Sequence, residues 1–152
     1  MEKLELKHIA PYLPYGLKVQ WTDHNHTCQR TIIGAGKNHV TFDAYLDEED
    51  QLSITILYYD SSKPILRPLS DLTKEIEVDG EKFVPAIELN WSNITSDILS
   101  KSIDLTNKFN NLFAFDYKKL CEWHFDVFGL IEKGLAIDIN SLNDFEELSK
   151  TF

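Results

Sequence analysis

The hydrophobic period of the chain changes near residues 75–80, and this change limits the possible folds more than any other feature. Before it, apolar and polar side chains alternate over residues 17–21, 40–46 and 52–59. Such alternation places apolar side chains on one face of a β-strand, and residues 31–33 form a shorter candidate. Four or five short antiparallel strands are therefore predicted. They would curl into a small, half-open barrel, for which an SH3-like barrel is one form.

Turn-forming residues separate the predicted strands. They lie at residues 23–26, 34–38, 47–50 and 60–64. The glycines of the second turn are expected to provide a positive φ. Pro64 and Pro68 would confine residues 65–72 to an edge, because proline cannot donate a ladder hydrogen bond. Asp79-Gly80 predicts the tight turn of a further hairpin over residues 78–83.

Beyond the change of period, apolar residues recur with the spacing of one helical face. Within residues 116–133 this face comprises Tyr117, Leu120, Cys121, His124, Val127, Phe128 and Ile131. Asp116 is the predicted N-cap, and Gly134 is the predicted residue after the C-terminal end. A weaker helical pattern covers residues 96–110.

Together these patterns predict an α+β fold. We expect an antiparallel β lobe over residues 1–76 and a mainly helical lobe over residues 77–152, packed into one compact unit. The chain has 152 residues, of which 43% are hydrophobic. A chain of this size buries roughly 68–70% of its unfolded surface on folding, which is enough for a shared core.

The formal net charge of −10 indicates what kind of partner the protein can bind. A protein that grips the phosphate backbone broadly needs clustered lysine and arginine, so the charge argues against that class. A basic protein surface is the expected partner, and the alternative is that the acidity only maintains solubility. The chain has no run of 18 apolar residues and no apolar signal segment at its start, so a cytoplasmic protein without membrane contact is predicted.

A cluster of imidazoles and a thiol raises the question of a metal site. His24, His26 and Cys28 lie close together, and Cys121 and His124 are separated by one helical turn. Zinc is bound by four such ligands, so a composed site is chemically conceivable. The alternative is a polar turn in the first segment and core positions in the second, where cysteine behaves as a small hydrophobe. We favour the alternative and predict no metal, with both cysteines as free thiols.

No catalytic motif is present: neither G-x-S-x-G nor H-E-x-x-H occurs, and no complete phosphate-binding loop. A non-enzymatic protein with no cofactor and no small-molecule substrate is therefore predicted. Aromatic residues of the β segments either stack on nucleic-acid bases or pack in the core: Trp21, Tyr45, Tyr58 and Tyr59. Core packing is favoured, because only a modest set of basic residues accompanies them: Lys18, Arg30, Lys63 and Arg67.

Three segments resemble a family of phage and prophage proteins of unknown function. They are residues 9–19 (IAPYLPYGLKV), residues 63–76 (KPILRPLSDLTKEI) and residues 122–140 (EWHFDVFGLIEKGLAIDIN). The resemblance provides no catalytic residues. It implies an origin in a mobile element and a bacterial host cell.

Small acidic phage proteins without catalytic motifs are often inhibitors of host machinery. The first hypothesis is a protein that binds and inhibits a host defence complex, such as a CRISPR effector nuclease or its complex with guide RNA. The second is an adaptor in phage DNA or RNA metabolism that binds single strands through the β lobe, and the third is a zinc-dependent hydrolase. The predicted protein-binding residues are Tyr45, Asp47, Glu48, Glu49, Asp50 and Tyr58, because acidic groups steer association and aromatic groups anchor it.

Overall fold

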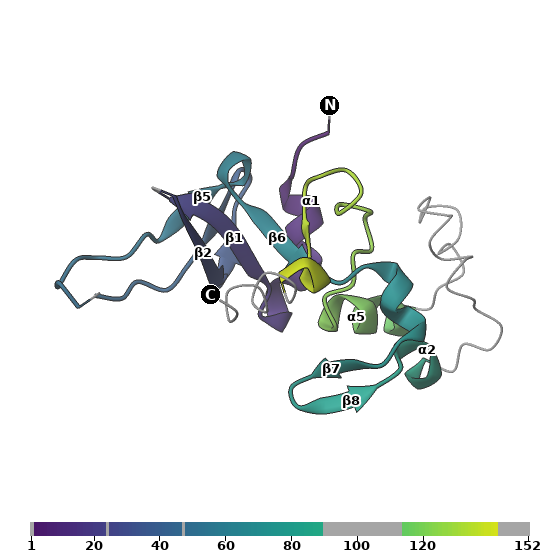
Figure 1. Ribbon diagram of the computed structural model, residues 1–152. Helices are drawn as coiled ribbons and strands as arrows, with labels where there is room; N and C mark the ends of the chain where they lie inside the picture. The colour runs from purple at the N-terminus through teal and green to yellow at the C-terminus, as the bar shows by residue number, and fades with distance from the viewer. Residues whose placement is uncertain (1, 24, 47, 90–113, 143–152) are drawn as a thin grey trace.

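The computed structural model describes residues 2–23, 25–46, 48–89 and 114–142 (Figure 1). The α+β class is confirmed. Within these ranges the strands form several small, mostly antiparallel sheets, and no closed barrel is present. The helix predicted over residues 96–110 lies outside the described residues.

The largest sheet has four strands in the order β2-β1-β6-β9. β1 (Lys18–Asp23) and β2 (His26–Thr31) form a hairpin, and β6 (Lys63–Leu66) lies antiparallel to β1 on its other side. β9 (Ile137–Asp138) runs parallel to β6. Residues from the second half of the chain therefore complete a sheet of the first half, and the division at residue 76 stays a prediction.

Pro64 lies inside this sheet, so the prediction that the two prolines exclude an interior strand is wrong. The reason is a stagger between the two neighbours of β6. β1 pairs with the first part of β6, where Val19 faces Pro64. β9 pairs with the second part, where Ile65 faces Ile137. Pro64 therefore has a strand on one side only, which is the position that a residue without an N–H group tolerates.

A second sheet consists of β3 (Gly34–Ala35), β4 (His39–Thr41) and β5 (Ile56–Tyr58), in that order. The predicted turn between its first strands is present, but its glycines do not have a positive φ. Glycine is needed at these positions for another reason: any side chain would collide with a neighbouring residue. A Cβ on Gly36 would lie 2.4 Å from the His39 ring, and one on Gly34 would lie 2.7 Å from the side chain of Thr41.

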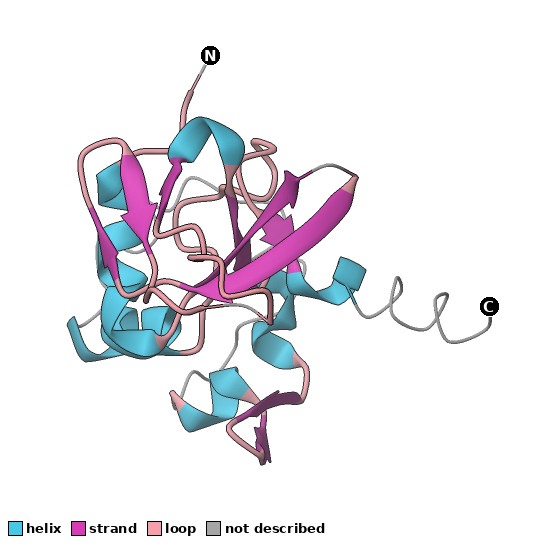
Figure 2. Ribbon diagram, turned by 90° about the vertical axis from the view of Figure 1, so that its left-hand side faces the viewer, coloured by secondary structure: helices cyan, strands magenta, loops and turns pink. Residues whose placement is uncertain are grey.

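The predicted hairpin over residues 78–83 is confirmed, and Figure 2 shows it standing apart from the larger sheet. β7 (Ile76–Val78) pairs with β8 (Glu81–Phe83). Asp79 and Gly80 both have positive φ, at 52° and 85°. Two such residues are the requirement of the tight turn that matches strand twist, and the Asp-Gly pair meets it. Three short helices complete this part of the chain: η2 (Tyr59–Ser61), η3 (Leu69–Thr73) and α2 (Pro85–Glu88).

The predicted long helix ends much earlier than expected. α5 (Ala114–Glu122) already contains Asp116, so this residue is not the N-cap, and the helix ends before His124 rather than near Gly134. His124 has a φ of 62°, and the Phe125 N–H donates to the Leu120 carbonyl at 2.9 Å. This bond spans five residues and is typical of a helix that ends in a left-handed residue.

Strand-like pairing of the following residues explains the early end of α5. The Arg67 N–H donates to the His124 carbonyl at 2.8 Å, and the Asp126 N–H donates to the Arg67 carbonyl at 2.9 Å. Phe125 thereby continues the ladder that β6 begins. Beyond it, the buried Asp126 carboxylate accepts the N–H groups of Leu130 and Ile131, at 2.8 and 2.9 Å. These bonds fix a loop where the apolar spacing predicts a helix.

The N-terminal residues form α1 (Leu6–Ile9) and η1 (Ala10–Tyr15), which packs against α5. Tyr12 of η1 is fully buried. Its hydroxyl donates to the Phe125 carbonyl and accepts the Val127 N–H at 3.2 Å. Residues from both halves of the chain pack into one hydrophobic core. Those that are completely buried in it include Ile9, Val19, Leu66, Leu120 and Leu130.

We expect Tyr12→Phe to lower the free energy of unfolding by about 0.5–1.5 kcal/mol, because the Phe125 carbonyl and the Val127 N–H lose the hydroxyl and keep only the bond that joins them at 2.9 Å. Urea unfolding at neutral pH measures this loss. Tyr15→Phe is the matched control, because the half-buried Tyr15 hydroxyl makes no hydrogen bond among the described residues. Equal urea midpoints for the two variants would show that the Tyr12 hydroxyl does not hold this segment.

Candidate functional site

A two-stranded arm, residues 42–58, projects from the second sheet and reaches away from the rest of the molecule (Figure 1). It extends β4 and β5 beyond the body of the protein. The Phe42 N–H donates to the Thr55 carbonyl, and the Ser53 N–H donates to the Tyr45 carbonyl, both at 2.9 Å. The arm is therefore a hydrogen-bonded ribbon over part of its length.

A β-bulge lies between these two bonds. Asp43 and Ala44 together face the single residue Ile54, because the pairing shifts by one residue along the arm. Successive side chains on a strand normally alternate, and the extra residue changes this order. As a result, Phe42 and Tyr45 lie on the same face of the arm.

Arg30 of β2 holds this face. Its guanidinium carbon lies 4.7 Å from the ring centre of Phe42 and 4.7 Å from that of Tyr45. The same group donates to the Ile54 carbonyl at 2.6 Å and to the Asp43 carbonyl. A planar guanidinium stacks on aromatic rings and presents several donors in fixed directions, so one residue fastens both strands of the arm.

The opposite face carries a row of exposed apolar side chains, which we call the apolar strip. Its members are Leu46, Leu52, Ile54, Ile56 and Tyr58, each between 43% and 72% exposed. Scattered apolar residues are normal on protein surfaces, but a contiguous row marks an interaction site. The alternation that predicted a strand over residues 52–59 is present, yet its apolar side faces solvent.

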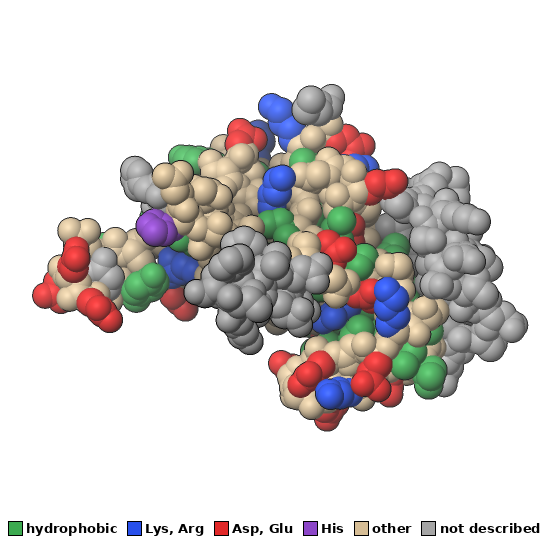
Figure 3. Space-filling model, viewed as in Figure 1, with side chains coloured by type: hydrophobic (Ala, Val, Ile, Leu, Met, Phe, Trp, Pro, Cys, Tyr) green, Lys and Arg blue, Asp and Glu red, His purple; other side chains and the backbone are tan. Residues whose placement is uncertain are grey.

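Glu48, Glu49 and Asp50 form the end of the arm, which we call the acidic tip. Figure 3 shows acidic side chains at the far end of the arm with hydrophobic ones beside them. Asp50 has a φ of 59°, which is the left-handed conformation that aspartate tolerates in tight turns. Asp47 lies outside the described residues.

The structure separates two residues that the sequence predicts in one binding patch. Tyr58 belongs to the apolar strip, whereas Tyr45 lies on the opposite face, under Arg30. Sequence reasoning also misses the leucines and isoleucines of the strip and the role of Arg30. The alternation over residues 52–59 was the available signal for the strip, but alternation does not reveal which face is covered.

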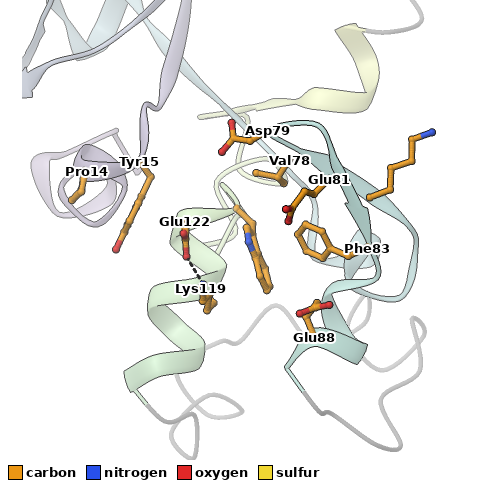
Figure 4. Close-up of a pocket in the computed structure, with 11 residues that line it drawn as sticks. Pro14, Tyr15, Val78, Asp79, Glu81, Phe83, Glu88, Lys119 and Glu122 are labelled. Carbon is orange, nitrogen blue, oxygen red and sulfur yellow. Dashed lines mark ion pairs between the residues drawn. The ribbon is translucent and has the colours of Figure 1, made fainter.

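An open groove of about 880 Å³ lies between η1, the β7–β8 hairpin and α5 (Figure 4). The rings of Phe83 and Trp123 pack at 4.9 Å on one side of it. Lys119 and Glu122 of α5 form an ion pair at 3.0 Å. The lining carboxylates outnumber the lysines: Asp79, Glu81, Glu88 and Glu122 against Lys82 and Lys119. Within the described part of the chain, no histidine, cysteine or serine lines it, so this lining holds no serine–histidine or cysteine–histidine pair.

The residues considered for a zinc site lie in different parts of the fold. His26 is exposed at the start of β2, Cys28 is half-buried on the same strand, and Cys121 is buried in α5. His124 donates from Nε2 to the Tyr15 carbonyl at 2.6 Å. Among the described residues, no three histidine, cysteine or acidic side chains come together in a way that could hold a metal. His24 lies outside them.

Burial disfavours the charged forms of Cys121, His124 and His8. Burial raises the pKa of the Cys121 thiol to about 11, so it is not a thiolate at neutral pH. Burial lowers the pKa of His124, and burial likewise lowers that of His8, whose Nδ1 accepts the Glu5 N–H at 3.0 Å.

No protein-family model, curated protein or solved structure matches the chain. None of the helices in the described ranges has the length and apolar content needed to span a bilayer. The arm and the groove must therefore be interpreted from their own chemistry.

We expect Arg30→Lys to loosen the arm while the body of the protein stays folded. Lysine cannot stack on both rings and reach both carbonyl groups. The N–H groups of Phe42 and Ser53 should exchange with deuterium about tenfold faster, as measured by hydrogen exchange. Lys18→Ala removes an exposed cation from the neighbouring strand and should leave this rate unchanged. Unchanged exchange in both variants would contradict the role of Arg30.

We also expect the stability to fall as the pH is lowered below about 6.5, where histidines of the unfolded chain become protonated. The lowered pKa values of His8 and His124 mean that the folded protein takes up these protons only at lower pH. The unfolded state then binds more protons than the folded state. The contribution of these two histidines to the free energy of unfolding is therefore fully present above the unfolded pKa of about 6.5, and it is lost as the pH falls below that value.

Urea unfolding between pH 7.5 and 5.5 tests this expectation. His124→Asn keeps a residue that tolerates the left-handed conformation, and it should reduce the dependence on pH. His26→Asn, at an exposed position, should leave it unchanged. A pH dependence identical in the wild type and His124→Asn would exclude His124 as its source.

Proposed function

We propose that this protein is a non-enzymatic inhibitor from a phage or prophage that binds a host defence complex, such as an RNA-guided CRISPR nuclease. The single observation that carries the proposal is the arm. It combines an exposed apolar strip with an acidic tip, it projects from the body, and Arg30 fastens its two strands to β2.

This combination suits the binding of a basic protein surface. Acidic groups at the end of the arm attract a partner of opposite charge and raise the rate of association. The apolar strip then provides the area that is removed from water, in which a tyrosine such as Tyr58 is a preferred anchor. The net charge of −10 acts in the same direction over longer distances.

The alternative proposal is an adaptor that binds single-stranded nucleic acid through the β lobe. The exposed rings of Tyr45 and Tyr58 favour it, because bases stack on such rings. Against it, Trp21 and Tyr59 are buried, and Arg30 is occupied by carbonyl groups of the arm. Retention on a single-stranded oligonucleotide that falls with rising salt would favour the adaptor.

The test is phage or plasmid restriction in a bacterial host that carries a defence system. Expression of the protein should relieve restriction. Charge reversal at the tip, Glu48→Lys with Glu49→Lys and Asp50→Lys, should weaken the relief at least tenfold, because the tip would then repel a basic partner.

The matched control makes the same change of charge elsewhere on the surface: Glu75→Lys with Glu77→Lys and Glu81→Lys, all at exposed positions. It should relieve restriction nearly as well as the wild type. Absence of relief by the wild type across hosts with different defence systems would overturn the proposed inhibition. Equal loss in both variants would assign the effect to net charge rather than to the arm.

A further inference from the structure

We infer that the arm binds an extended segment of its partner, which adds as a strand along the free edge of β5 and carries basic residues at the end nearest the acidic tip. This inference rests on the proposed function, since it specifies how the arm would engage a protein. It names the backbone of Ile56 as the centre of the contact.

The hydrogen bonds of the arm show which backbone groups face outward. Thr55 and Tyr59 bond to the strand of β4, through the Phe42 N–H and the Asn38 carbonyl. In an antiparallel pair, residues that bond to the partner strand alternate with residues whose N–H and C=O groups point away. Ile56 is therefore turned outward, and β5 is the last strand of its sheet.

Side chains cap this edge on either side of Ile56. Arg30 donates to the Ile54 carbonyl at 2.6 Å, and the Ser62 hydroxyl donates to the Tyr58 carbonyl at 3.3 Å. Among the described residues, neither the N–H nor the C=O group of Ile56 has a hydrogen-bond partner. An unpaired edge of this kind is a template for another strand, and proteins usually cover it or place charges on it.

The side chains around Ile56 fit an extended segment with alternating apolar residues. Ile54, Ile56 and Tyr58 stand on one face, at the two-residue spacing of a strand. A strand added beside them would place every second side chain against this row. The main-chain bonds would hold the segment, and the apolar strip would select its side chains.

Charge decides between a second copy of this chain and a different partner. A second copy carries the same net charge of −10, so association between copies is opposed by electrostatic repulsion. The acidic tip lies beyond Leu52, at one end of the apolar strip. Lysine or arginine at the corresponding end of the bound segment would meet opposite charge there.

The test uses a short synthetic peptide of alternating valine and threonine that ends in lysines. We expect titration to shift the Ile56 N–H signal in ¹⁵N NMR spectra before any signal of the groove or of β2. The same peptide ending in glutamates should bind at least tenfold more weakly. Failure of the lysine peptide to move the Ile56 signal at millimolar concentration would overturn the inference. Shifts that depend on protein concentration without peptide would identify a second copy as the occupant and would also overturn it.

Two variants separate the backbone from the side chain. Ile56→Thr keeps the outward N–H and should reduce affinity several-fold, whereas Ile56→Pro removes the N–H as well and should abolish binding. Proline is tolerated at an outward-facing edge position, and unchanged signals of Phe42 and Val40 would confirm that the arm still pairs. Equal affinity of Ile56→Pro and Ile56→Thr would refute strand addition.

The outcomes also separate this inference from the proposed function. Peptide binding at Ile56 without any relief of restriction would overturn the defence inhibitor and support strand addition. Relief of restriction that survives Ile56→Pro would support the inhibitor and overturn strand addition.

Discussion

The pairing of β6 on both of its sides is the constraint on which the rest of the structure depends. β1 takes the first residues of this strand and β9 takes the later ones, and Phe125 continues the same ladder beside Arg67. This arrangement brings the end of the described chain onto a sheet formed near its beginning. Tyr12 then closes the contact from the N-terminal side, since its hydroxyl bonds to two buried backbone groups of the same segment, the Phe125 carbonyl and the Val127 N–H.

The body and the arm use apolar residues in opposite ways. In the body, helices and sheets bury them in one core, and titratable groups such as Asp126 and His124 are engaged by backbone partners. In the arm, a row of leucine and isoleucine side chains keeps 43–72% of its surface in water, and that exposed area contributes nothing to the folding of this chain alone. Arg30 fixes the position of that row, so the ordering cost is met before a partner arrives.

The groove and the arm differ in the chemistry that they present. The groove between η1 and α5 is acidic and lined by aromatic rings, its described lining contains no serine, cysteine or histidine, and burial raises the pKa of the Cys121 thiol to about 11. The arm, by contrast, presents apolar area, charge and an open strand edge on one narrow ribbon. The proposed inhibitor specifies which partner the arm binds, whereas strand addition specifies how the arm binds it. The same ribbon could bind any basic partner that offers an extended segment.

The sequence by itself determined the α+β class, the alternating segments, and the Asp79-Gly80 turn, because each depends on neighbours along the chain. It also indicated the acidic tip. Only the tertiary structure decided that Pro64 lies inside a sheet, since the stagger of β1 and β9 is not encoded locally. The same holds for the end of α5 before His124, where pairing with Arg67 overrides helical spacing. It holds for the apolar strip as well. Alternation shows that a strand has two faces, but the exposure of Ile54 and Ile56 depends on what the rest of the chain covers.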